Sequence, residues 1–258
     1  NVSNVSDLRA NGVSAAALRH FVFSTHYRKQ LNLSGDALEA IEIVRNTTRA
    51  HIIFCPTFYS PDPVLGKVFG KMPERYFEEI RKAPREVDFA WTGPRVIPEE
   101  IPATHLKETA ALLGRKPFLW DNLFANDGPR NCKFLKLRSP QGRTRDALIE
   151  AAGWAWNPMN QAALSRMVIL ASRHALVEGI EPELALVRAV RESCSEPLAA
   201  FVERNRETFV SDGLDKISPA TKEALLVELR AWRGEPVARE ISQWISGGYT
   251  VGAECLTD

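Results

Sequence analysis

The sequence predicts an α/β fold with parallel strands, followed by an all-helical region. Four short apolar runs alternate with segments of helical periodicity between residues 51 and 157. This rhythm is typical of parallel strands joined by right-handed crossovers, and both a barrel and a doubly wound sheet fit it. Each apolar run ends in polar or aromatic residues, and from Met159 onward the pattern is helical.

The expected strands are His51–Phe54, Val87–Trp91, Pro117–Trp120 and Trp154–Trp156. Proline residues 56, 61 and 63 predict a loop after the first strand. Helical spacing predicts helices over Glu74–Lys82, Ala103–Leu113 and Arg143–Ala151. Gly114 is expected to end the second of these helices, because glycine readily adopts the left-handed conformation found there.

Two further helical regions flank this part, which gives domains 1–50, 51–160 and 161–258. Residues 14–29 and 34–48 predict a helical hairpin at the start of the chain. The last domain is predicted to contain helices at residues 162–176, 181–193, 197–209, 219–232 and 235–245. Charged residues such as Glu203, Arg204, Arg206 and Glu207 are expected to pair along one helix.

Composition bears on which partners, metals and cofactors are to be expected. The net charge of +1 gives no electrostatic reason to expect nucleic acid or an anionic membrane as a partner. No apolar run approaches the length of a membrane span. The four cysteines are far apart and fit no metal spacing. They indicate free thiols in a reducing, cytoplasmic compartment, and neither a metal nor a cofactor is expected.

The start of the chain contains three distinctive segments, Val5–Leu8, Ala17–Phe21 and Ser24–Leu33. In these segments it resembles cysteinyl-tRNA synthetases just after their KMSKS loop. It implies helices that contact tRNA in that family, but the motifs that form the adenylate are not in this sequence. Residues 1–50 carry six Lys/Arg against four Asp/Glu, so tRNA is not expected as a partner.

Polar and aromatic side chains gather where the predicted strands end. The third strand ends in Trp120, Asp121 and Asn122, and its loop holds Asp127. Barrel enzymes place their sites at the carboxyl ends of the strands. Amide and carboxylate groups there can bind a polyhydroxylated ligand beside the flat ring of Trp120. An ordinary strand end capped by Asn and Asp explains this one tip equally well, and four such tips strengthen the functional interpretation.

The strand ends and the loops after them carry a second set of motifs: Phe54–Tyr59, Trp91–Pro94, Trp120–Asn122 with Asn126–Asp127, Gly142–Arg143 and Asn157–Met159. In these motifs the sequence resembles family-84 glycoside hydrolases, the O-GlcNAcases and related β-N-acetylglucosaminidases. The resemblance runs from about residue 51 to the end of the chain. It implies a partial (β/α)8 TIM-type barrel, strands five to eight only, followed by the family's helical domain.

The resemblance further implies a ligand and roles for five residues. The ligand is a glycoconjugate bearing N-acetylglucosamine, cleaved in this family through attack of its own acetamide on the anomeric carbon. Tyr59 and Asn122 would line the acetamide pocket with Trp120 as a wall, while Asp127 and Asn157 would bind the sugar hydroxyls. No residue is assigned as catalytic, because the family's aspartate pair belongs to strand four and no two aspartates are adjacent here.

Four strands of an eight-stranded barrel leave two open edges and an uncovered inner face. We therefore expect the half barrel to pair with a second copy or with an N-terminal half barrel. Three interpretations stay open: a hydrolase-like chain that keeps its sugar-binding strand ends, a cysteine-tRNA ligase fragment, and a non-catalytic interaction module. An exposed apolar strand edge without sugar binding would favour the third.

Overall fold

The computed structural model describes residues 44, 46–47 and 50–251, and this part confirms an α/β fold with a parallel sheet. The strands are β1 (Ile52–Phe54), β2 (Val87–Trp91), β3 (Phe118–Asp121) and β4 (Gly153–Trp156). All neighbours are parallel, and the order across the sheet follows the chain, β1-β2-β3-β4. Val44, Asn46 and Thr47 are helical, as expected; the rest of the predicted hairpin lies outside the described residues.

One face of the sheet is covered by helices. Leu119 stands opposite Trp91 and Trp154 in the register, so these side chains share a face. They pack in one apolar cluster with α5 (Tyr76–Ile80), α6 (Ala103–Leu113) and α7 (Arg145–Glu150). Ile53 and Trp120 alternate to the opposite face and are 40% and 45% exposed. The two faces therefore differ, since one builds a core and the other presents apolar side chains.

Local signals explain most helix boundaries between the strands. Gly114 ends α6 with φ of 70°, and the Thr144 hydroxyl caps α7 by accepting from the Ala147 amide. The loop expected after β1 was wrong in part, because α4 spans Pro63–Phe69. Pro63 occupies the first helical turn, where its missing N–H costs nothing, and the preceding Asp62 caps the helix.

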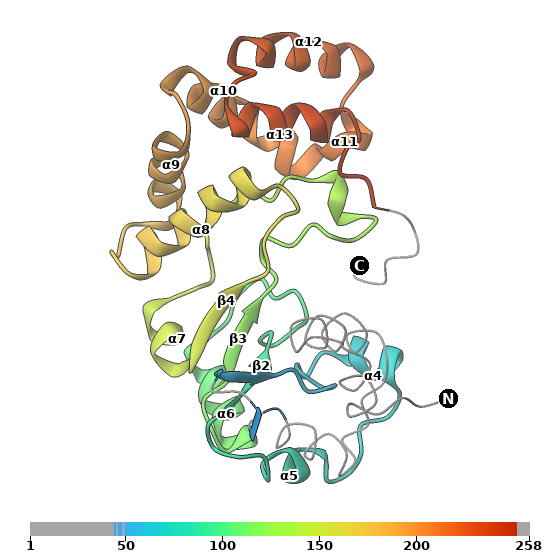
Figure 1. Ribbon diagram of the computed structural model, residues 1–258, viewed down its shortest axis with the longest axis vertical. Coiled ribbons are helices and arrows are strands. Elements are labelled where there is room, and N and C mark those ends of the chain that lie inside the picture. Colours follow the sequence, from blue (N-terminus) through green and yellow to red (C-terminus); the bar gives the residue numbers. More distant parts are fainter. Residues whose placement is uncertain (1–43, 45, 48–49, 252–258) are drawn as a thin grey trace.

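The second half of the chain forms the helical region (residues 161–251), which lies beyond the sheet in Figure 1. Its helices are α8 (Ala162–Leu176), α9 (Pro182–Ser193), α10 (Glu196–Glu207), α11 (Gly213–Lys216), α12 (Pro219–Leu229) and α13 (Pro236–Ile245). A π-helical turn, Thr208–Asp212, follows α10, and a 3-10 turn, Arg230–Trp232, follows α12. Its core includes Phe201, Phe209 and Trp244, all fully buried.

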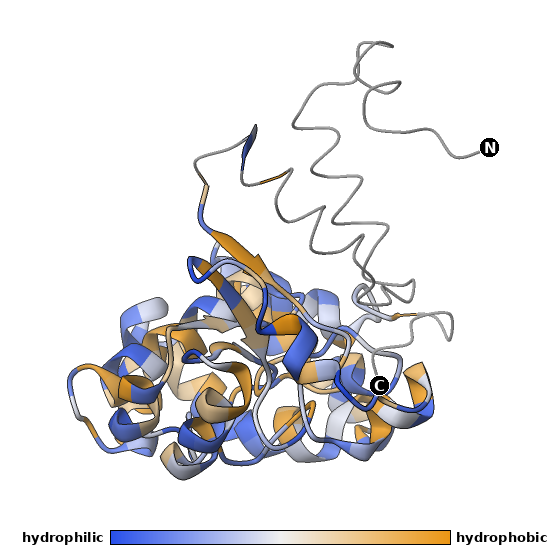
Figure 2. Ribbon diagram, turned by 90° about the horizontal axis from the view of Figure 1, so that it is seen from below, coloured by the Kyte–Doolittle hydropathy of each residue, from blue (hydrophilic) through white to orange (hydrophobic). Residues whose placement is uncertain are grey.

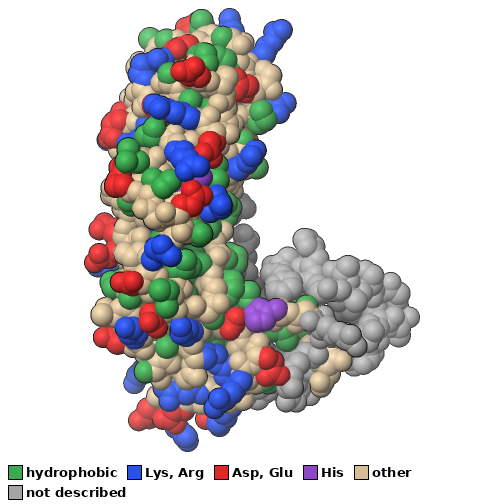
Figure 3. Space-filling model, turned by 90° about the vertical axis from the view of Figure 1, so that its left-hand side faces the viewer, with side chains coloured by type: hydrophobic (Ala, Val, Ile, Leu, Met, Phe, Trp, Pro, Cys, Tyr) green, Lys and Arg blue, Asp and Glu red, His purple; other side chains and the backbone are tan. Residues whose placement is uncertain are grey.

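Side-chain hydropathy agrees with this arrangement. Figure 2 shows hydrophobic strands among helices of mixed hydropathy, as expected for amphipathic helices around a sheet. In Figure 3, Lys and Arg are interspersed with Asp and Glu over the visible face. No helix in the described part of the chain is long and apolar enough to cross a membrane.

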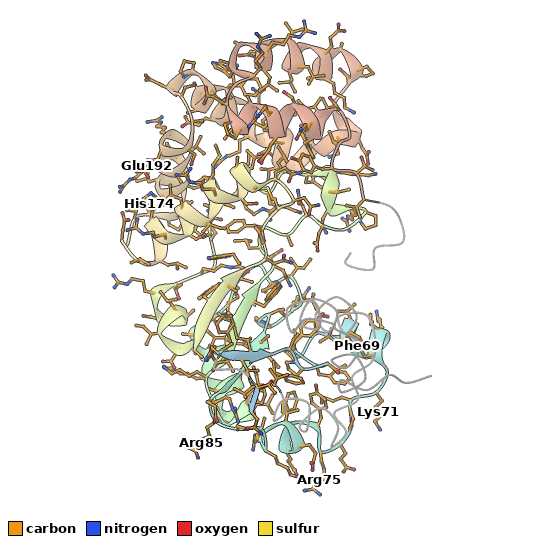
Figure 4. The ribbon with its side chains drawn as sticks, viewed as in Figure 1. Phe69, Lys71, Arg75, Arg85, His174 and Glu192 are labelled. Atoms are coloured by element: carbon orange, nitrogen blue, oxygen red, sulfur yellow. The ribbon has the colours of Figure 1, made fainter. Side chains whose placement is uncertain are left out.

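Charged side chains connect neighbouring helices of the helical region. His174 of α8 is buried and contacts Glu192 of α9 at 3.0 Å (Figure 4). The α10 arginines, expected to pair within their own helix, pair instead with α12 and α9: Arg204 with Glu228 at 2.5 Å and Arg206 with Glu183 at 2.8 Å. These ion pairs are largely exposed, so each contributes little to stability but helps to fix how the helices meet.

Candidate functional site

Two of the predicted site residues are joined directly at the carboxyl edge of the sheet. Asn122 follows β3 and Asn157 follows β4, and the Asn157 carboxamide donates a hydrogen bond of 3.0 Å to Oδ1 of Asn122. The Asn157 backbone N–H also donates to the Asp121 carbonyl at 2.9 Å. Parallel pairing thus continues one residue past β4, which fixes the Asn157 backbone against the end of β3.

Asn122 is held from its other side as well. Its Nδ2 donates a bond of 2.7 Å to the carbonyl of Val96, in the loop after β2. Asn122 is nearly buried, whereas Asn157 is half-buried. An asparagine side chain offers two donor hydrogens and an acceptor oxygen. Among the described residues nothing donates to Oδ1 of Asn157, so that oxygen can accept from a ligand hydroxyl.

A buried ion pair supports this pair of amides from beneath. Arg143 donates to both oxygens of Asp121 at 2.9 and 2.7 Å, and both side chains are fully buried. The Asp121 carboxylate also accepts from Nε1 of Trp154 and from the Leu123 amide. Asp121 therefore faces the helices rather than a ligand, although it stands at a strand end.

The same arginine fixes the loop that carries Val96. Its guanidinium donates to the carbonyls of Pro98 at 3.0 Å and Glu99 at 2.5 Å. The Gly142 carbonyl accepts from the Ile101 amide at 2.9 Å. The loop after β2 cannot move away from Arg143 without breaking these bonds. The Val96 carbonyl is therefore held in position to accept the hydrogen bond from Asn122.

Tyr59 lies in the loop after β1 and is half-buried. Its carbonyl accepts from the Thr92 amide at 3.1 Å, which sets it beside the end of β2. The preceding Phe58 amide donates to the phenol oxygen of Tyr76 at 3.1 Å. Burial raises the pKa of Tyr76 to about 12, so the phenol that accepts this bond stays neutral at ordinary pH.

Asp127 lies in the long loop between β3 and α7, next to a fully buried asparagine. Asn126 donates to Oε1 of Gln161 at 2.9 Å and accepts from the Asn160 amide at 2.8 Å. Further along the loop, Nε1 of Trp244 donates to the Cys132 carbonyl at 3.0 Å. The helical region thus holds the loop in which half-buried Asp127 is found.

Trp120 stands one residue before the strand end, on the face of the sheet opposite the one that α5, α6 and α7 cover. The five predicted residues therefore lie at the end of a strand or in the loop that follows one, and a hydrogen bond joins Asn122 to Asn157. Sequence reasoning missed the supporting roles of Asp121 and Arg143. Strand alternation could have found them, because Asp121 shares the buried face with Leu119 and a buried carboxylate requires a partner.

The described part of the chain contains no group of three or more His, Cys, Asp or Glu side chains placed to hold a metal ion. The family model of β-N-acetylglucosaminidases matches residues 7–203, well over half of the chain. The chain belongs to this family. The match begins within the segment that resembles cysteinyl-tRNA synthetases, and that second resemblance stays a prediction.

Individual relatives agree with the family. The chain is 26% identical to mouse Protein O-GlcNAcase over 137 residues, which cover 53% of this chain and 14% of the relative. The rat protein gives the same identity and coverage. The chain thus aligns with only a small part of these curated relatives.

Solved structures share the fold. A variant of Thermobaculum terrenum O-GlcNAc hydrolase superposes with a TM-score of 0.57 at 22% identity, covering 90% of this chain and 46% of that one. The protein CpGH84B gives the same TM-score at 19% identity, with 92% and 44% coverage. The chain therefore spans less than half of the structures that it resembles.

Proposed function

We propose that this chain binds the terminal N-acetylglucosamine of a glycoconjugate at the carboxyl edge of its sheet. The observation that carries the proposal is the Asn122–Asn157 pair, held at 3.0 Å above a buried ion pair. Family membership supplies the class of sugar, and the pair supplies a preorganised polar surface. Preorganisation matters because a site whose side chains are already fixed loses little conformational entropy on binding.

Each of the five residues has a role in this proposal. Asn122 and Tyr59 bind the acetamide group, and Trp120 covers an apolar face of the sugar. Asp127 and Oδ1 of Asn157 accept hydrogen bonds from sugar hydroxyls.

Hydrolysis in the proposed scheme needs a general acid. The acetamide oxygen attacks the anomeric carbon and forms an oxazoline, while a general acid protonates the departing oxygen. No two aspartates are adjacent in this sequence, so we propose that the aspartate pair comes from outside it. Without the general acid, the step slows by about 10²–10⁴-fold.

We further propose that β1–β4 form half of a (β/α)8 barrel. The consecutive parallel order, the helices on one face and the exposed Ile53 and Trp120 on the other support it. The open edges would be closed by a second copy or by an N-terminal half barrel. Sedimentation velocity tests this: a monomer that also fails to bind an apolar-surface dye would contradict it.

Binding of an N-acetylglucosamine-derived oxazoline mimic, measured by calorimetry, tests the sugar site. Asn122→Ala should abolish binding, since it removes the amide that contacts both Val96 and Asn157. Asn205→Ala is the matched control, because the Asn205 carboxamide donates to the Phe201 carbonyl within α10, in the helical region. Failure of the unchanged protein to bind, or equal losses in both variants, would reject the proposal.

A further inference from the structure

A cleft lies in the helical region, between α12 and α13. Figure 1 shows these helices at the end of the molecule farthest from the sheet. Its volume is about 380 Å³, within the range of small-molecule pockets. The lining residues are Leu226, Leu229, Arg230, Arg233, Arg239, Ser242 and Gln243. Three of these seven carry a positive charge and none carries a negative one.

The charges of this cleft are not neutralised by nearby carboxylates. Within residues 50–251, no ion pair or hydrogen bond is formed by the guanidinium groups of Arg230, Arg233 and Arg239. The glutamates nearest in sequence to these arginines are engaged elsewhere. Glu228 pairs with Arg204 at 2.5 Å, Glu235 accepts from the amide and hydroxyl of Ser195, and Glu240 accepts from the backbone amides at the start of α8.

Most arginines of the neighbouring helices, in contrast, form ion pairs. Five of the six arginines of α8–α10 each pair with a glutamate: Arg173, Arg188, Arg191, Arg204 and Arg206. Like charges that line one cleft repel, and this repulsion opposes folding unless an anion relieves it. The gathering of three arginines without a carboxylate partner on one cleft therefore indicates a binding role for them.

The remaining lining residues indicate which other groups a ligand of this cleft would carry. Oε1 of Gln243 accepts from the Tyr249 hydroxyl at 3.0 Å, which leaves its amide hydrogens as donors. Leu226 supplies apolar surface from α12, whereas Leu229 beside it is buried. Guanidinium groups bind phosphate oxygens in a bidentate manner. We propose that the cleft binds a small organic phosphate, with its phosphoryl groups on the arginines and its apolar body against Leu226.

Calorimetry at low ionic strength with two probes, inorganic pyrophosphate and ADP, tests the proposal. Arg233→Gln with Arg239→Gln should weaken both affinities at least about tenfold. The control is Arg85→Gln with Arg145→Gln, which removes the same charge from exposed positions in the sheet half of the molecule. Arg85 is labelled in Figure 4, and Arg145 begins α7. It should change affinity less than about twofold, because distant exposed charges are screened.

Each outcome decides a part of the proposal. Tighter binding of ADP than of pyrophosphate supports an organic phosphate, and equal binding rejects the apolar contact. The absence of pyrophosphate binding to the unchanged protein rejects the site. Equal losses in the two double variants would mean that net charge, and not this cleft, attracts the anion.

Discussion

Replacing Arg143 with methionine is expected to lower the free energy of unfolding by about 3–5 kcal/mol. The guanidinium donates twice to Asp121, and both side chains are fully buried. It also donates to the Pro98 and Glu99 carbonyls, each bond contributing about 0.5–1.5 kcal/mol. The larger part of the loss comes from the Asp121 carboxylate, which would stay buried without its cation.

Urea unfolding followed by circular dichroism measures this loss. Arg145→Met is the matched control, because it makes the same chemical change two residues away at an exposed position; we expect a change within about 0.5 kcal/mol. Combining Arg143→Met with Asp121→Asn should recover part of the stability, since the stranded charge is removed. Arg143→Met within about 1 kcal/mol of the unchanged protein would refute the reasoning, as would a double variant that loses the full sum of both changes.

Three further changes test other supports of the site. Tyr76→Phe should remove a pH dependence of the free energy of unfolding, because burial raises the pKa of Tyr76 to about 12 whereas an unfolded phenol titrates near about 10. About 2–3 kcal/mol of stability is therefore present below pH ~10 and lost as pH rises toward 12, and parallel unfolding curves for both proteins over this range would contradict it. Gly142→Ala should cost about 2 kcal/mol or more in urea unfolding, because φ is +72° and the new Cβ would lie 2.4 Å from the Glu99 carbonyl; a neutral effect would show that the loop adapts. Trp244→Phe should speed amide exchange in residues 123–137 by removing the donor to the Cys132 carbonyl, and unchanged exchange would mean that this bond does not hold the loop.

Strands with local signals could be predicted from the sequence. Val87–Trp91 was predicted with the bounds that the structure gives, because apolar residues fill the run and Thr92-Gly93-Pro94 ends it. The helix Ala103–Leu113 was likewise correct, with Gly114 as its signal. In both segments the information lies within a few residues of the boundary.

Features that depend on distant residues could not be predicted in this way. The third strand was predicted to end at Trp120, but it includes Asp121, since Arg143 makes a buried carboxylate tolerable there. The ion pairs of α10 join other helices, because helix packing and not sequence spacing decides which charges meet. Family resemblance named the five site residues, whereas the structure alone showed which carbonyls and amides support them.

The candidate site rests on two separate supports, and this separation makes its parts testable one by one. Arg143 fixes the loop after β2, and through the Val96 carbonyl it orients Asn122 and then Asn157. The helical region fixes the loop that holds Asp127, through Trp244. Disturbing Arg143 should therefore affect recognition of the acetamide group, while disturbing Trp244 should affect recognition of the hydroxyls. This arrangement gives the helical region a structural role at the site. The helical region supplies no proposed ligand contact of its own at this edge, but it positions the loop that holds Asp127.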